Sequence, residues 1–251
     1  MHGIHGIEIY CQTDLGCQRE NNEDSFGSWQ PATDAECAQK GVLLVVADGM
    51  GGYEGGQEAS RLAVETVKEI YAGSLAEDPQ TLLFKGLREA HARIMHYAAR
   101  HPGMRGMGTT CTAVALVGKN LYFAHVGDSR LYRVRKGEIV RLTRDHSYVG
   151  RLVESGAISP EEAETHVQRH ILTAALGAGA EVFPDVPEQP LTVEENDLLI
   201  LCTDGLWGLV NDSEIASTVN EMLPPDAVRR LIQLARERGG PDNITVLLLA
   251  A

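Results

Sequence analysis

Four aspartates in this sequence stand beside glycine or proline at the edge of a strongly apolar stretch. They are Asp48, Asp128, Asp204 and Asp242. A single Asp–Gly turn is usually structural, but four carboxylates at the strand ends of one compact domain can converge on one rim. Converging carboxylates repel each other, so they require a bound cation or strongly raised pKa values. The pattern therefore predicts a metal site.

The predicted ligands are all oxygen atoms, because no cysteine or histidine joins these aspartates by pattern. Oxygen-only coordination selects the hard divalent ions Mg²⁺ or Mn²⁺ over zinc. Four carboxylates exceed what one Mg²⁺ ion usually takes from a protein, so we expect two ions. Two ions suit in-line displacement at phosphorus. Arg19 is a candidate for binding the phosphate, since a guanidinium holds two phosphate oxygens at once.

Short apolar runs predict the strands that carry these aspartates. The runs are 42–47, 110–117, 121–126, 130–135, 139–142, 198–202 and 244–249. The short turns between residues 110 and 142 force antiparallel pairing. Amphipathic helices are expected at 57–73, 79–100, 213–222 and 226–238. Because several strands are apolar on both faces, we predict an α+β fold: a four-layer α-β-β-α sandwich of two antiparallel sheets flanked by helices.

Two segments lack the strand pattern. Residues 144–185 interrupt it with short helical patterns, so we expect a small helical flap over one rim of a single domain that spans 1–251. The basic residues of this segment, including Arg144, would attract an anionic substrate or would simply form a solvated helical face. Residues 30–40 are polar and predict a hairpin loop.

The chain as a whole is acidic. It has 251 residues and a formal net charge of −13, from 35 acidic and 22 basic residues. Nucleic acids and anionic membranes require a basic surface, so we expect neither as a partner. The five cysteines form no C-x-x-C pair, which predicts reduced thiols and a cytoplasmic protein. We expect no signal peptide and no membrane-spanning run.

Eight short motifs follow one another along the chain. In order they are R-E-N-N-E-D at 19–24, V-A-D-G-M-G-G at 46–52, G-T-T at 108–110, H-V-G-D-S-R at 125–130, L-T-R-D-H-S at 142–147, L-T-A-A-L-G at 172–177, C-T-D-G-L at 202–206 and G-G-P-D-N-I-T-V at 239–246. Together they cover nearly the whole chain. In this order the sequence resembles the bacterial branch of the type 2C, metal-dependent serine/threonine protein phosphatases (the PPM family).

The resemblance implies a set of metal ligands. Asp48 would bridge two Mn²⁺ or Mg²⁺ ions, and Gly49 would offer its carbonyl oxygen to one of them. Asp204 and Asp242 would complete the second site, and Asp128 would help to hold a possible third, weaker ion. The resemblance further implies hydrolysis of phosphoserine and phosphothreonine by attack of a metal-bridging hydroxide.

The resemblance also implies two catalytic residues outside the metal ligands. Asp24 would form a hydrogen bond to metal-bound water, and Arg19 would bind the substrate phosphate. Many family members carry a histidine near the glycine motif that is proposed to protonate the leaving alkoxide, whereas this chain has Met50 and Tyr53 there. Another acid is then needed, either metal-bound water or a flap histidine such as His146.

The implied substrates are phosphorylated proteins, namely the targets of a cognate bacterial Ser/Thr kinase and the kinase itself, and we expect a monomer. A catalytically inert metal-binding scaffold of the same fold is the alternative, and it would be expected to lose one or more ligands. A kinase or nucleotide hydrolase would need a G-x-x-x-x-G-K-[ST] loop or an H-R-D loop, and the sequence has neither. The acidic charge argues against a nuclease.

Overall fold

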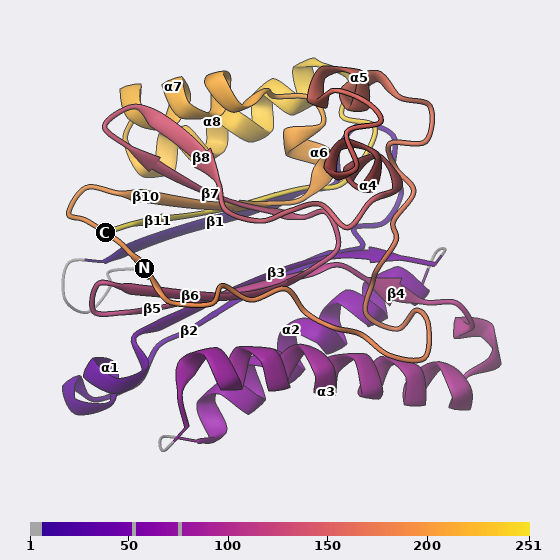
Figure 1. The fold of residues 1–251 in the computed structure, drawn as a ribbon, viewed down its shortest axis with the longest axis horizontal. Helices are drawn as coiled ribbons and strands as arrows, with labels where there is room; N and C mark the ends of the chain where they lie inside the picture. The colour runs from indigo at the N-terminus through magenta and orange to yellow at the C-terminus, as the bar shows by residue number, and fades with distance from the viewer. Residues whose placement is uncertain (1–6, 52–53, 75–76) are drawn as a thin grey trace.

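The computed structural model describes residues 7–51, 54–74 and 77–251. Two antiparallel sheets pack face to face, and helices cover the outer face of each sheet (Figure 1). One sheet has the strand order β1-β11-β10-β7-β8, and the other has the order β2-β3-β5-β6-β9, with β4 also paired to β3. The predicted α+β, four-layer sandwich is confirmed.

The strands are mostly apolar segments of four to nine residues, with two shorter ones at the rim. They are β1 (Glu8–Asp14), β2 (Asp24–Trp29), β3 (Val42–Met50), β4 (Gly108–Thr109), β5 (Cys111–Val117), β6 (Asn120–Val126), β7 (Arg130–Arg135), β8 (Glu138–Arg141), β9 (Leu191–Thr192), β10 (Leu198–Cys202) and β11 (Ile244–Ala250).

The helices form the two outer layers and the smaller peripheral pieces. They are α1 (Asp34–Lys40), α2 (Gly55–Gly73), α3 (Pro79–Arg100), α4 (Tyr148–Glu154), α5 (Pro160–Thr165), α6 (Asp204–Trp207), α7 (Asp212–Glu221) and α8 (Pro224–Glu237), with a 3-10 turn at Pro102–Met104. Helices α2 and α3 lie on the β3 sheet, and α7 and α8 lie on the β10 sheet (Figure 1).

Three apolar layers hold these elements together, one between the sheets and one beneath each pair of helices. Strand β3 shows why it is apolar on both faces. Leu44 and Val46 point into the layer between the sheets, while Leu43 and Val45 point toward α2 and α3. Successive side chains of a strand alternate between its faces, so a strand in the middle of four layers must be apolar throughout.

Residues 30–40 differ from the prediction of a hairpin loop, because α1 occupies most of them. The Thr33 hydroxyl caps this helix by accepting a hydrogen bond from the Glu36 amide at 3.3 Å. Acidic residues stand in its first turn and Lys40 stands in its last turn, which favours a helix electrostatically. The polar composition reflected a solvent-facing helix rather than a loop.

The segment 144–185 contains the short helices α4 and α5, and its described residues form isolated bridges instead of full strands. It lies at the end of the sandwich near β4 (Figure 1). Two of the bridges attach it to the sheet, between Thr109 and Leu176 and between His125 and Asp185. We refer to residues 144–185 as the flap.

Gly41, between α1 and β3, has a backbone conformation that a substitution can test. It has φ 58° and ψ −137°, and a Cβ atom there would lie 1.7 Å from the Leu116 carbonyl oxygen. We expect Gly41→Ala to lower the free energy of unfolding by about 3 kcal/mol. Gly73→Ala is the matched control, since its Cβ would meet nothing within 4 Å at the end of α2. Urea unfolding should show a neutral or stabilising control; equal destabilisation by both changes would contradict the assignment of strain to Gly41.

Candidate metal and phosphate site

Five aspartates from both sheets converge at one end of the sandwich. They are Asp24, Asp48, Asp128, Asp204 and Asp242. Burial raises the pKa of Asp48 well above its ordinary value, and the charges of the other four raise it further. The pKa of Asp128 is likewise raised, first by burial and then by Asp204. The four predicted metal ligands and Asp24 therefore share one electrostatic site.

Asp48 and Gly49 lie inside β3, which continues beyond the predicted end at residue 47. Asp48 stands directly opposite Asp24 of β2, and Gly49 pairs with Thr109 of β4. The added pairing explains why the strand runs on to Met50. A Cβ atom at position 49 would lie only 2.1 Å from the Gly56 carbonyl oxygen, so glycine is required there and the backbone is tightly enclosed.

Asp24 connects the two sheets. Its Oδ2 accepts hydrogen bonds from the hydroxyl of Thr203, at 2.9 Å, directly after β10 of the opposite sheet, and from the hydroxyl of Thr245, at 2.7 Å, within β11 of that sheet. Its Oδ1 is buried and has no hydrogen-bond partner among the described residues. Burial raises the pKa of Asp24 to about 7, although the two hydroxyls oppose this. One carboxylate oxygen is thus fixed, and the other faces the site.

A directed chain of hydrogen bonds supports this carboxylate. Thr245 donates its single hydroxyl proton to Asp24. It must therefore accept the hydrogen bond from the Thr13 hydroxyl, 2.8 Å away. Thr13 in turn accepts from the Asn22 side-chain amide at 2.8 Å. Sequence reasoning did not single out Thr203 or Thr245, although both stand in the aspartate motifs at 202–206 and 239–246.

Arg19 and Asp242 form an ion pair at the rim. The Arg19 Nη2 atom donates to the Asp242 Oδ2 atom at 2.7 Å, and half of the Arg19 side chain is exposed. A guanidinium has five N–H donors, so Arg19 can hold Asp242 and still present donors outward. The structure therefore brings the predicted phosphate-binding residue to the predicted metal ligands.

Asn243 holds the two loops that carry this ion pair, and its role was not predicted from the sequence. Its side-chain amide donates to the carbonyl oxygens of Leu15 and Asn21, each at 3.0 Å. Its Oδ1 accepts from the Glu23 amide at 2.8 Å. One side chain thereby ties the loop that carries Arg19 to the loop that carries Asp242. Its position directly after the aspartate, in the motif at 239–246, was the available signal.

His146, named as a possible acid, and His170 are two histidines of the flap. His146 uses both ring nitrogens: Nδ1 accepts from the Gly127 amide at 3.2 Å, and Nε2 lies 3.2 Å from the Asp185 carboxylate. A ring held on both sides is poorly placed to protonate a leaving group. His170 is instead the flap histidine beside a predicted ligand, with Nδ1 3.9 Å from Asp204 Oδ2.

Met50 and Tyr53 were the two residues found where many family members carry histidine. Met50 ends β3 and lies over Gly108, where an added Cβ would be 3.0 Å from the Met50 methyl carbon. Tyr53 lies outside the described residues. Met50 cannot supply the acid, because a thioether side chain has no ionisable proton.

The donor set fits a divalent metal ion. Besides Asp24 Oδ1, the Oδ1 atom of Asp204 is buried without a hydrogen-bond partner in the described part of the chain. Mutually repelling carboxylates with orphaned oxygens are stabilised by a bound cation. Over residues 7–51, 54–74 and 77–251, no group of three or more His, Cys, Asp or Glu side chains is arranged so that it could hold a metal ion by itself. An ion here would add backbone oxygens and water to its shell, as Mg²⁺ commonly does.

Comparisons with known proteins agree with this geometry. The family model described as Protein phosphatase 2C matches residues 18–236. The chain is 36% identical to the serine/threonine protein phosphatase PstP of Mycobacterium tuberculosis over 245 residues, which cover 96% of this chain and 44% of PstP. It is 33% identical to the protein phosphatase PhpP of Streptococcus pneumoniae, with 97% of both chains covered.

Solved structures show the same likeness. The serine/threonine phosphatase of S. agalactiae superposes with a TM-score of 0.88 at 36% identity, covering 98% of this chain and 99% of that one. The catalytic domain of PstP in complex with two manganese ions gives a TM-score of 0.83 at 33% identity, with 97% of both chains covered.

Neutralising one carboxylate should stabilise the protein without metal. The charge of Asp204 acts on each of the other four aspartates, so we expect Asp204→Asn to raise the free energy of unfolding in EDTA by about 1–2 kcal/mol. Added Mn²⁺ should stabilise the unaltered protein more than the variant. Thermal unfolding in EDTA and in Mn²⁺ measures both effects.

Asp197→Asn is the control for Asp204→Asn, because Asp197 is a buried aspartate that is paired with an arginine. It is 1% exposed and lies 2.6 Å from Arg135. Burial is the largest single influence and would raise its pKa, but the hydrogen bonds from Arg135 and from the Glu194 amide, together with the charges of Arg135 and Arg133, lower the pKa overall. Asp197→Asn should therefore destabilise by about 2 kcal/mol or more. Loss of stability in Asp204→Asn as well would refute carboxylate repulsion as a destabilising force in the site.

His125, at the root of the flap, should make stability depend on pH. Its Nε2 lies 3.0 Å from two carbonyl oxygens and its Nδ1 lies 2.8 Å from the Thr112 hydroxyl, so the ring is neutral with the proton on Nε2. Burial lowers its pKa to about 4, against about 6.5 when unfolded. The unfolded chain binds more protons between these values, so stability falls as pH drops through this window.

The expected contribution of His125 is a loss of about 2–3 kcal/mol of unfolding free energy between pH 7 and pH 4.5. Urea unfolding at both values, for the unaltered chain and for His125→Gln, isolates it from the carboxylates. The variant should be less stable at pH 7 and lose less on acidification. Equal losses in both proteins would exclude His125 as the titrating group.

Proposed function

The chain belongs to the protein phosphatase 2C family of metal-dependent serine/threonine protein phosphatases, and we propose that the aspartate cluster is its metal centre. The observation that carries this proposal is the convergence of Asp48 with four other aspartates beside Arg19. In this proposal the protein hydrolyses phosphoserine and phosphothreonine in phosphorylated proteins. The chain spans less than half the length of PstP, so the proposal concerns this catalytic unit.

The proposed ligand roles are the ones that the resemblance to the family implies. Asp48 and Gly49 serve the ions from β3, Asp204 and Asp242 serve them from the opposite sheet, and Asp128 holds a third, weaker ion. Mn²⁺ and Mg²⁺ both suit this oxygen donor set. When bound, two such ions activate water and neutralise the phosphoryl oxygens.

Arg19 and Asp24 are the proposed catalytic side chains outside the ligand set. Arg19 is anchored to Asp242 and half exposed, so its outward N–H groups can bind a substrate phosphate. Asp24 is held through one oxygen by Thr203 and Thr245, which leaves the other oxygen to orient water in the site. Both roles follow from side chains that are already fixed by neighbours, which is the condition for precise positioning.

The inert-scaffold alternative has less support. A scaffold without catalysis would tolerate the loss of a ligand, whereas the four predicted aspartates and Arg19 are all present and brought together. No observation on the described residues favours a second activity.

We further propose that residues 1–251 act as one catalytic domain, a monomer in the cytoplasm, with the flap at 144–185 facing the substrate. The five cysteines, all within the described residues, are free, which suits a reducing compartment. Its substrates in this proposal are the targets of a cognate bacterial Ser/Thr kinase and the kinase itself. No helix in the described ranges is long and apolar enough to cross a membrane.

Phosphate release from a phosphothreonine peptide tests the proposed function. We expect release with Mn²⁺, none with excess EDTA, and a loss of at least about 100-fold in kcat/KM for Arg19→Ala, because a charged pair to phosphate is removed. Arg61→Ala is the matched control, since Arg61 pairs on the surface with Glu58 and Glu65 of α2 and should keep full activity. Folded, metal-bound protein that releases no phosphate from any phosphopeptide would favour the scaffold.

A further inference from the structure

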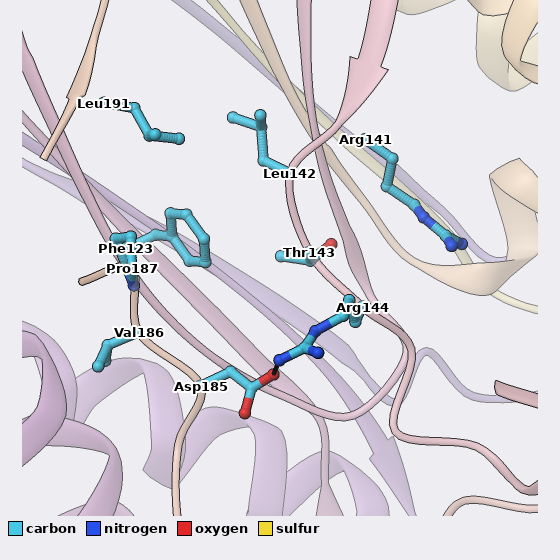
Figure 2. A pocket seen from close by; sticks show the side chains of 9 residues that line it. All are labelled: Phe123, Arg141, Leu142, Thr143, Arg144, Asp185, Val186, Pro187 and Leu191. Carbon is cyan, nitrogen blue, oxygen red and sulfur yellow. Dashed lines mark hydrogen bonds and ion pairs between the residues drawn. The ribbon is translucent and has the colours of Figure 1, made fainter. Parts of the chain in front are cut away.

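A groove opens at the side of the sandwich, next to the flap. It encloses about 340 Å³ and is lined by Phe123, Arg141, Leu142, Thr143, Arg144, Asp185, Val186, Pro187 and Leu191. Figure 2 shows Leu142 and Thr143 on one side of the groove and the Arg144 guanidinium reaching across to Asp185 at one end. On the other side it shows Phe123, Val186, Pro187 and Leu191. The Arg141 guanidinium points away from the other lining residues (Figure 2) and pairs with Asp145.

The groove forms because the segment between Asp185 and Leu191 separates from the edge of β6. It touches β6 where Asp185 pairs with His125 and again where Leu191 pairs with Leu121. Between these two contacts the returning chain advances by six residue positions while β6 advances by four. The returning chain therefore bows outward. Pro187 and Pro190 have no N–H with which to continue the ladder. Between the two contacts, the Phe123 carbonyl accepts its hydrogen bond from the Gln80 side chain at 2.8 Å.

The Arg144 guanidinium at the end of the groove has only long, exposed ion pairs. The Arg144 side chain is 72% exposed, and its ion pairs are long, at 3.4 Å to Asp185 and 3.7 Å to Glu154. Exposed pairs of this kind contribute little to stability, so an incoming carboxylate can replace them. The exposed guanidinium of Arg144 beside the apolar groove therefore favours a partner that places a carboxylate next to an apolar side chain.

The groove also contacts the residues that hold the metal-site loop. Asp185 lies 3.2 Å from His146 Nε2, and His146 Nδ1 accepts from the amide of Gly127, the residue before Asp128. A segment bound in the groove therefore lies on the flank of the site where the flap joins the sandwich. A substrate tethered there has a higher effective concentration at the metal centre than a free peptide.

We propose that this groove docks an acidic segment of the phosphoprotein substrate, separate from the phosphorylated residue. An apolar side chain of that segment packs against Phe123, Leu142 and Leu191, and an adjacent carboxylate pairs with Arg144. The inference rests on the proposed function, and it names the feature that would distinguish preferred substrates.

The first test measures binding without catalysis. A fluorescent, unphosphorylated peptide with the segment Glu-Leu-Glu-Glu should bind at least about five-fold more tightly than its Gln-Leu-Gln-Gln counterpart by anisotropy, as one charge-assisted contact predicts. Arg144→Glu should abolish this preference and favour a Lys-Leu-Lys-Lys segment instead. Val186→Glu should block the groove. Arg88→Glu, an exposed charge reversal on α3 that does not line the groove, should leave the preference intact.

The second test measures turnover. A phosphothreonine peptide joined to the acidic segment by flexible linkers of graded length should have a KM at least about five-fold lower than the same peptide with the neutral segment. Val186→Glu should remove this difference while hydrolysing the short peptide at the unaltered rate. The ratio of kcat/KM between extended and short peptides is compared within each variant.

The outcomes separate the two proposals. Hydrolysis of short and extended peptides with equal kcat/KM, together with equal binding of acidic and neutral segments, would overturn the docking groove and leave the phosphatase function standing. Acidic binding without hydrolysis of any phosphopeptide would overturn the proposed function instead. Dimerisation that Val186→Glu abolishes, without peptide binding, would assign the groove to a second copy of the chain and refute the proposal.

Discussion

Repulsion among five aspartates is the constraint around which this molecule is arranged. Each of the five would be more stable in water, away from the others, and burial raises the penalty for bringing their charges together. The fold keeps the carboxylates close together despite this penalty, because rigid strand ends of both sheets lie at the same end of the sandwich. Asp48 comes from within β3, and Asp204 follows β10 on the opposite sheet. Neither residue can move away from the cluster without disrupting a strand that is apolar on both faces.

The supporting contacts explain how the cluster keeps its shape. Hydroxyl donors from one sheet hold Asp24 of the other, so the two halves of the sandwich are joined by hydrogen bonds at the site as well as by the apolar layer between them. Asn243 adds a second junction, between the loops of Arg19 and Asp242. Small displacements of reacting groups lower the rate of an enzyme strongly, and these side chains limit displacements within the candidate site.

The sequence was informative where a pattern has a single physical cause. Short apolar runs predicted the strands, and aspartates beside glycine or proline predicted a metal site, so the sandwich and the candidate ligands could be stated in advance. The pattern could not show that β3 runs past Asp48, because that depends on pairing with β4, far along the chain. Nor could it distinguish a polar loop from the solvent-facing helix α1. Asn243 and Thr245 were also missed, since their roles arise only from loops that meet in three dimensions.

The bowed segment between Asp185 and Leu191 bears on aggregation. A sheet edge with free N–H and C=O groups can recruit a strand from another molecule, and proteins suppress this with proline, short edge strands and covering loops. Here β9 is two residues long, Pro187 and Pro190 follow the exposed side of β6, and Gln80 occupies the Phe123 carbonyl. The same residues that keep a hollow open beside the flap therefore deny a foreign strand a continuous template. Replacing either proline to fill that hollow would remove part of this protection.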